Sequence, residues 1–152
     1  MSTPAIRVLE AASVRYRVLE YELGPAAESY GLEAAEKLSL PPERVFKTLV
    51  AAVDGRHVFA VVPVAERLET KALGKRAHLA DAADAERITG YVKGGTSVFG
   101  SRRRLPVLLD ESALEHETIV VNGGRRGLQV ELAPGDLLAV TGGNVQRLTS
   151  RA

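Results

Sequence analysis

The chain contains 152 residues with a mass of 16.3 kDa, which is the size of one typical domain, and we expect residues 1–152 to form a single domain. Apolar residues make up 45% and charged residues 26% of it, a composition that argues against disorder, collagen and coiled coil. With 20 basic and 19 acidic residues the net charge is +1, so the overall positive excess of a typical nucleic-acid-binding protein is missing. Any binding of nucleic acid would have to use a local basic patch.

Several kinds of chemistry are made improbable by residues and motifs that the sequence lacks. It has no cysteine, so disulfides, thiolate metal sites and a cysteine nucleophile are excluded. His57, His78 and His116 show neither H-x-x-x-H nor H-E-x-x-H spacing, and there is no G-x-S-x-G elbow, so we expect no metal, no cofactor and no serine triad. No apolar run could span a bilayer and the first residues do not look like a signal peptide, so we expect a cytoplasmic protein.

The first half of the chain predicts helices and a β-hairpin. Thr3 can cap a helix that has Pro4 at its first position. Asp54 and Gly55 are typical of a type I′ turn between two apolar, β-branched runs. The further elements that we expect here are a strand over 16–21, a helix over 31–38 and the two hairpin strands, 45–53 and 57–62.

The second half predicts a second hairpin and three more helices. A Gly- and Arg-rich loop should cover 90–105, and a Gly-rich turn at 123–127 should join two strands. The elements that we expect are helices over 68–75 and 81–88, strands over 107–109, 118–121 and 128–132, and a short helix that begins near 134 and ends at 140. Because the strands cluster in hairpins, we predict an α+β fold with a mostly antiparallel, barrel-like sheet.

Lys47 is the most unusual residue of the first hairpin. It is the only charge in a strand whose two faces are both apolar, and a buried ammonium group must reach water, a partner or a ligand. A lysine at the end of a strand most often extends to water, whereas a ligand would make it part of a site. The residues alone leave both interpretations open.

Glycines, arginines and tyrosines provide the other candidate site residues. Gly94 and Gly95 begin a loop whose amides could approach a carbonyl or phosphate, although an ordinary surface loop has the same composition. Tyr21 and Tyr30 could stack on a base or a sugar, or could simply border the core. Clustered arginines could form a phosphate-binding rim or a solvated face, namely Arg102, Arg103, Arg104, Arg125 and Arg126.

Five short segments, taken together, carry a resemblance to a known family. They occur in this order: Thr3-Pro4-Ala5, Val45-Phe46-Lys47-Thr48-Leu49, Thr89-Gly90-Tyr91-Val92-Lys93-Gly94-Gly95, Arg104-Leu105-Pro106 and Gly123-Gly124-Arg125-Arg126-Gly127-Leu128. The combination resembles the YbaK/EbsC family of aminoacyl-tRNA deacylases, which is related to the editing domain of bacterial prolyl-tRNA synthetases. The resemblance is greatest to the YbaK branch, which removes cysteine from tRNA(Pro) and from tRNA(Cys). It implies a curved, largely antiparallel, barrel-like sheet flanked by helices. It also implies aminoacyl-tRNA as substrate, prolyl-tRNA synthetase as a candidate partner and no cofactor.

The resemblance also implies roles for individual residues. Lys47 would contact the ester at the tRNA 3′ end, Gly94 would face the scissile carbonyl with Gly95 beside it, and Tyr21 and Tyr30 would line the pocket. Thr48 in the same motif, together with Asn122 and Gln129, would bind substrate, and the five arginines would contact tRNA phosphates.

Three positions depart from the family pattern. Val98 stands where the family loop commonly has proline, Asn122 where the best-known cysteine-specific member has serine, and Gln129 where the family has aspartate. The implied mechanism is attack of the substrate's own thiol on its ester. Two alternatives stay open: a water-using deacylase of another small aminoacyl-tRNA such as Ala-tRNA(Pro), and a module that binds aminoacyl-tRNA or a synthetase without chemistry.

Overall fold

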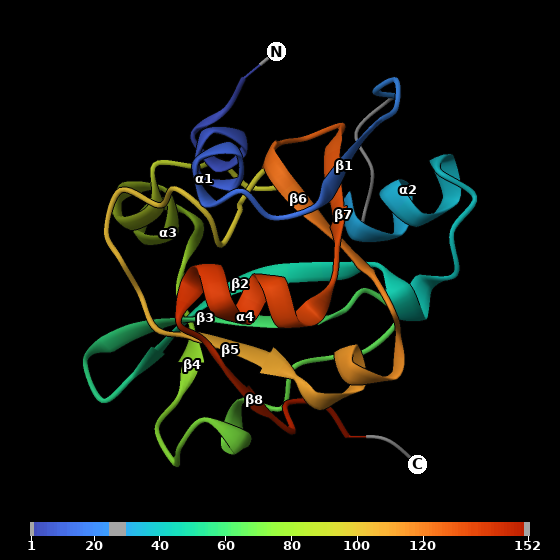
Figure 1. The fold of residues 1–152 in the computed structure, drawn as a ribbon. Coiled ribbons are helices and arrows are strands. Elements are labelled where there is room, and N and C mark those ends of the chain that lie inside the picture. The colour runs from blue at the N-terminus through green and yellow to red at the C-terminus, as the bar shows by residue number, and fades with distance from the viewer. Residues whose placement is uncertain (1, 25–29, 151–152) are drawn as a thin grey trace.

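The computed structural model describes residues 2–24 and 30–150, whose strands form two sheets (Figure 1). One sheet has the order β1-β7-β6, with β1 (Tyr16–Glu20), β6 (Ile119–Arg125) and β7 (Leu128–Leu132) all antiparallel. The other has the order β4-β2-β3-β5-β8, with β2 (Phe46–Val53), β3 (Arg56–Pro63), β4 (His78–Leu79), β5 (Val107–Asp110) and β8 (Asn144–Gln146). The predicted α+β class is confirmed, although the strands of the described residues form two sheets rather than one closed barrel.

Local signals in the sequence explain the elements that were predicted well. The Thr3 hydroxyl accepts a hydrogen bond from the Ile6 amide at 3.2 Å and caps α1 (Pro4–Ala12). Asp54 and Gly55 have φ values of 50° and 80°, as a type I′ turn requires, and β2 pairs with β3 from Phe46↔Pro63 to Val53↔Arg56. The other helices are α2 (Tyr30–Lys37), α3 (Ala82–Thr89) and α4 (Pro134–Thr141), with short 3₁₀ turns η1 (Pro42–Arg44), η2 (Thr70–Ala72) and η3 (Glu111–Glu115).

The structure corrects the sequence-based predictions in two places. Residues 68–75 were expected to form a helix, but only η2 is helical there. Leu68 instead forms a bridge with Thr149, and the Glu69 amide donates to the Leu148 carbonyl at 2.8 Å, so this segment is held by a distant part of the chain. The strands β4 and β8 were not predicted, and β5 pairs in parallel with both β3 and β8.

The main core lies between the sheets and under α1. It buries side chains from both sheets, among them Phe46, Phe59, Ile119 and Val130, together with Phe99 from the loop that follows α3. A parallel bridge between Val45 and Val120 joins the start of β2 to β6. The two sheets therefore meet close to Lys47.

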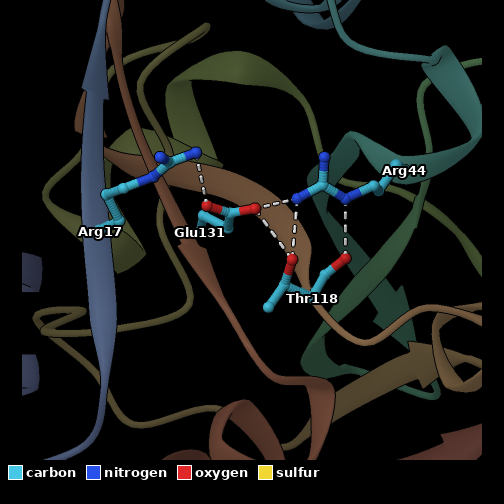
Figure 2. A network of polar contacts seen from close by, with 4 residues as sticks. All are labelled: Arg17, Arg44, Thr118 and Glu131. Atoms are coloured by element: carbon cyan, nitrogen blue, oxygen red, sulfur yellow. Dashed lines mark hydrogen bonds and ion pairs between the residues drawn. The ribbon is translucent and has the colours of Figure 1, made fainter.

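A polar network fixes the same junction from outside (Figure 2). Glu131 on β7 forms ion pairs with Arg44 of η1 and, at 2.9 Å, with Arg17 of β1. The hydroxyl of Thr118 donates to Glu131 at 2.9 Å, and Arg44 Nε donates to the Thr118 carbonyl at 3.0 Å. Because η1 directly precedes β2, this network holds the segment that leads into Lys47.

Within residues 2–24 and 30–150, no helix is long and apolar enough to cross a membrane. The same residues contain no group of three or more His, Asp or Glu side chains that could hold a metal ion.

Candidate active site

A cavity of about 480 Å³ lies between β2, α2, α3 and the loop that follows α3. β2 forms one wall, while β6 and β7 contribute Asn122 and Gln129. Of the predicted site residues, the cavity brings together Tyr30, Lys47, Thr48, Gly94, Asn122 and Gln129. These residues come from five different elements, so the fold and not the local sequence assembles them.

Lys47 lies near the start of β2 and is partly buried in the cavity wall. Burial is the largest cause that lowers the pKa of its ammonium group, and the charge of Arg67 lowers it further, while Glu66 acts in the opposite direction. Among the described residues Lys47 has no ion pair. A weakly solvated cation of this kind is well placed to interact with an anionic or polarised group of a ligand.

Thr48 carries a hydroxyl that has no hydrogen-bond partner in the described part of the chain, although its oxygen is buried. Buried polar groups in proteins are almost always satisfied, so such an exception needs an explanation. Since Thr48 lines the cavity, a bound ligand can supply the missing partner.

Gly94 and the ring of Tyr30 both line the cavity and lie in close contact with each other. Gly94 has a φ of +85°, and a Cβ atom at this position would lie 2.9 Å from the Tyr30 ring carbons. The carbonyl of Gly94 accepts a hydrogen bond from Asn122 Nδ2 at 3.0 Å, and Asn122 Oδ1 accepts one from the Gly124 amide at 2.6 Å. Glycine is therefore needed here for two reasons: the backbone is left-handed, and the Tyr30 ring leaves no room for a side chain.

The loop that carries Gly94 is anchored although Val98 stands where the resemblance led us to expect a proline. The Val98 side chain is buried in the main core. The Tyr91 hydroxyl donates to the Phe99 carbonyl at 2.6 Å, and the Ser97 hydroxyl accepts from the Phe99 amide at 3.1 Å. These contacts supply order that proline would otherwise contribute.

Comparison with known proteins identifies the kind of domain that holds this cavity. Residues 25–140 match the family model of the aminoacyl-tRNA editing domain. The chain belongs to the aminoacyl-tRNA editing family. It is also 35% identical, over 156 aligned positions, to EbsC of Enterococcus faecalis (strain ATCC 700802 / V583), whose provisional name is Cys-tRNA(Pro)/Cys-tRNA(Cys) deacylase. The alignment covers 98% of this chain and 94% of EbsC.

Two solved structures have the same fold as this editing domain. One, provisionally named a trans-editing enzyme for prolyl-tRNA synthetase, is 25% identical with a TM-score of 0.82 and matches 99% of this chain and 100% of its own. The other, a hypothetical protein called APE2540, is 24% identical to this chain with a TM-score of 0.87. The match covers 97% of this chain and 100% of the APE2540 chain, and it supports the fold alone. The predicted YbaK/EbsC family, its fold and its enzyme class, aminoacyl-tRNA deacylase, are confirmed.

Two of the predicted site residues, Gly95 and Tyr21, are not among the described residues that line the cavity. The Gly95 amide donates to the Val92 carbonyl at 2.9 Å, so it is not available to stabilise an oxyanion. A Cβ atom on Gly95 would lie 2.7 Å from Arg125 Cα, which shows that this glycine is needed for packing. Tyr21 packs beside a smaller apolar cluster, where burial raises the pKa of its phenol.

The predicted rim of five arginines is also not assembled around the pocket. Arg125 pairs with Glu20 at 3.1 Å and Arg126 pairs with Glu33 at 2.8 Å. Arg102 reaches the Arg87 carbonyl at the end of α3, and Arg104 lies near Gly142 at the end of α4 and lines a separate, smaller cavity. Contact of these five arginines with tRNA phosphates stays a prediction.

Sequence reasoning did not find Glu86 and Lys93, two charged residues that line the cavity. Glu86 lies four residues after Ala82 on α3, and both face the cavity together with Ala85. The helix was predicted correctly, but only the tertiary structure shows that this face borders the site.

Proposed function

We propose that this chain, acting as one domain over residues 1–152, is a trans-editing deacylase of Cys-tRNA(Pro) and Cys-tRNA(Cys). The proposal rests on the relative EbsC and its name, and on the trans-editing enzyme of the same fold. The observation that carries it is the cavity in which Lys47 and Gly94 lie together. Prolyl-tRNA synthetase, which would release mischarged tRNA(Pro), is the proposed partner.

The substrate's own thiol is the nucleophile in the proposed mechanism. The described lining of the cavity includes no histidine, serine or cysteine, and the Thr48 hydroxyl has no general base bonded to it. A thiol has a pKa of about 8.5, so a few per cent is thiolate at pH 7. The thiolate sulfur attacks the carbonyl carbon, the bond to the ribose oxygen breaks, and that oxygen takes up a proton as tRNA leaves. Water then opens the cyclic thiolactone to free cysteine.

The protein contributes orientation and electrostatic stabilisation to this reaction. The Lys47 ammonium group favours the thiolate and the negative charge that develops on the ester oxygen. The Gly94 amide, which donates to no acceptor among residues 2–24 and 30–150, is the backbone donor that we assign to the same oxygen. Holding the thiol close to the ester lowers the activation barrier by several kcal/mol, about the size of other proximity effects.

Glu86 is the carboxylate that lines the described part of the cavity, and we assign it to the substrate's α-ammonium group. Gln129, which is buried next to Asn122 on the neighbouring strand, cannot supply the negative charge that the family's aspartate provides. A carboxylate on the opposite wall can compensate by pairing with the ammonium group.

The experiment that tests this function follows ester loss from tRNA charged with cysteine, serine or alanine. We expect Cys-tRNA to be cleaved much faster than Ser-tRNA and Ala-tRNA to be almost inert, with and without added prolyl-tRNA synthetase. Lys47→Ala should remove most of this activity while the far-ultraviolet spectrum is retained, and Lys71→Ala, a change in η2 outside the cavity, should not. Equal cleavage of Cys- and Ala-tRNA would favour a water-using deacylase, and binding without cleavage would favour a recruiting module.

A further inference from the structure

Arg126 makes an unusual set of contacts for a residue in a surface turn. Its Nε and a terminal nitrogen donate to the two oxygens of Glu33 at 3.0 and 2.8 Å, which is a bidentate pair. Only 7% of the Glu33 side chain and 21% of the Arg126 side chain are exposed. The guanidinium carbon also lies 4.7 Å from the centre of the Tyr30 ring. Tyr30 and Glu33 are three residues apart on α2, so both face the same way.

The β6–β7 hairpin contacts two walls of the cavity. Arg126, in its turn, contacts the first helical turn of α2, where Tyr30 lines the cavity. Asn122, on strand β6, donates to the carbonyl of Gly94, and Gly94 lies against the Tyr30 ring. The hairpin therefore holds both partners of the Tyr30–Gly94 contact.

We propose that Arg126 is a positioning residue that, with Glu33, holds the Tyr30 ring against Gly94, and that it is not a contact for tRNA phosphate. This inference rests on the proposed deacylase function. A phosphate that bound the Nε edge of Arg126 would have to displace a carboxylate that is already bound bidentately and is almost fully buried, which would leave that charge without its partner. The cation–π contact adds a second restraint on the ring. Without the pair, Tyr30 keeps its place in the helix but its ring loses both restraints.

Nuclear magnetic resonance tests the contact in the free protein, independently of catalysis. With labelled arginine and tyrosine, we expect a slowly exchanging Arg126 Nε–H signal in the wild type and its loss in Glu33→Gln. The Tyr30 ring signals, assigned with Tyr30→Phe, should shift in the same variant. Unchanged Tyr30 signals in Glu33→Gln would overturn the proposal, whatever the enzyme's substrate proves to be.

Kinetics then separates positioning from phosphate binding. Arg126→Gln should lower kcat on Cys-tRNA roughly 10- to 100-fold, the size of effect that small misplacements produce, and should leave the dependence of KM on salt unchanged. Arg126→Lys, which keeps the charge but not the bidentate geometry, should be equally impaired. The control Arg56→Gln, at an exposed arginine that begins β3 and is not part of the described cavity lining, should leave both kcat and the dependence of KM on salt unchanged.

The opposite pattern would show that Arg126 binds tRNA. A weaker dependence of KM on salt with unchanged kcat in Arg126→Gln, or a wild-type kcat in Arg126→Lys, would overturn the positioning role. If wild-type protein fails to cleave any aminoacyl-tRNA, the proposed function fails, while the resonance experiment still decides whether Glu33 and Arg126 position Tyr30.

Discussion

Replacing Gly94 by alanine tests how tightly the cavity is built. Two costs are expected, because Gly94 has a left-handed backbone and no room for a side chain. Placing a residue with a Cβ atom at a φ of +85° costs about 1–2 kcal/mol. The new methyl group would also lie 2.9 Å from the Tyr30 ring, well inside ordinary contact distance, and overpacking of this kind costs about 1–3 kcal/mol. The total expected loss is about 2–5 kcal/mol of unfolding free energy.

Gly55→Ala is the matched control for the backbone contribution. Gly55 has a φ of +80°, and nothing lies within 4 Å of a Cβ atom placed there, so only the cost of the backbone, about 1–2 kcal/mol, applies. Urea unfolding of both variants measures the difference. In a Tyr30→Ala background the cost of Gly94→Ala should fall to that of Gly55→Ala. Equal losses for the two single variants, or no effect of removing the ring, would refute the close contact.

Three further substitutions have expected outcomes of different kinds. Glu131→Gln should lower the free energy of unfolding by about 1–3 kcal/mol at pH 7. Burial raises the pKa of Glu131, but the Thr118 hydroxyl and the two arginines outweigh it and lower the pKa overall. The stabilisation by Glu131 is therefore present above the unfolded pKa and lost as the pH falls through the folded pKa, and urea unfolding should show the variant and wild type converging at acid pH. A difference that persists at acid pH would contradict this. Thr48→Val should stabilise the free protein by about 1 kcal/mol, because it removes an unsatisfied hydroxyl. The same change should raise KM, because the ligand loses its partner. A destabilised variant with unchanged KM would argue against a ligand at this position. Glu86→Gln should raise KM for Cys-tRNA but not for N-acetyl-Cys-tRNA, which has no ammonium group, and an equal effect on both would remove Glu86 from ammonium binding.

The elements that could be predicted from the sequence are those with local signals. The Thr3 cap and the Asp54-Gly55 turn each specify a backbone geometry within a few residues. The parallel pairing of β5 with β3 and β8 carries no such signal, because it depends on segments that are far apart in the chain. Residues 68–75 have helical spacing, but pairing of Leu68 with Thr149 decides their structure.

The same distinction applies to the site. Lys47 could be singled out because a single charge in an apolar strand is unusual in itself, but only the family resemblance assigned it to a site. The pair between Arg126 and Glu33 could not be predicted, because the two residues lie 93 positions apart and nothing near either one indicates it. Glu86 was overlooked for the related reason that an acidic residue on a helix is ordinary until its neighbours across the cavity are known.

The most direct test of the central claim compares Cys-tRNA(Pro) with the same tRNA carrying S-methylcysteine, under single-turnover conditions with wild-type protein. The two substrates differ by one methyl group, and only the first has a thiol that can attack its own ester. We expect the cysteinyl ester to be lost rapidly and the S-methyl ester to survive at close to its uncatalysed rate. Loss of both esters at similar rates would contradict the account and make water the nucleophile.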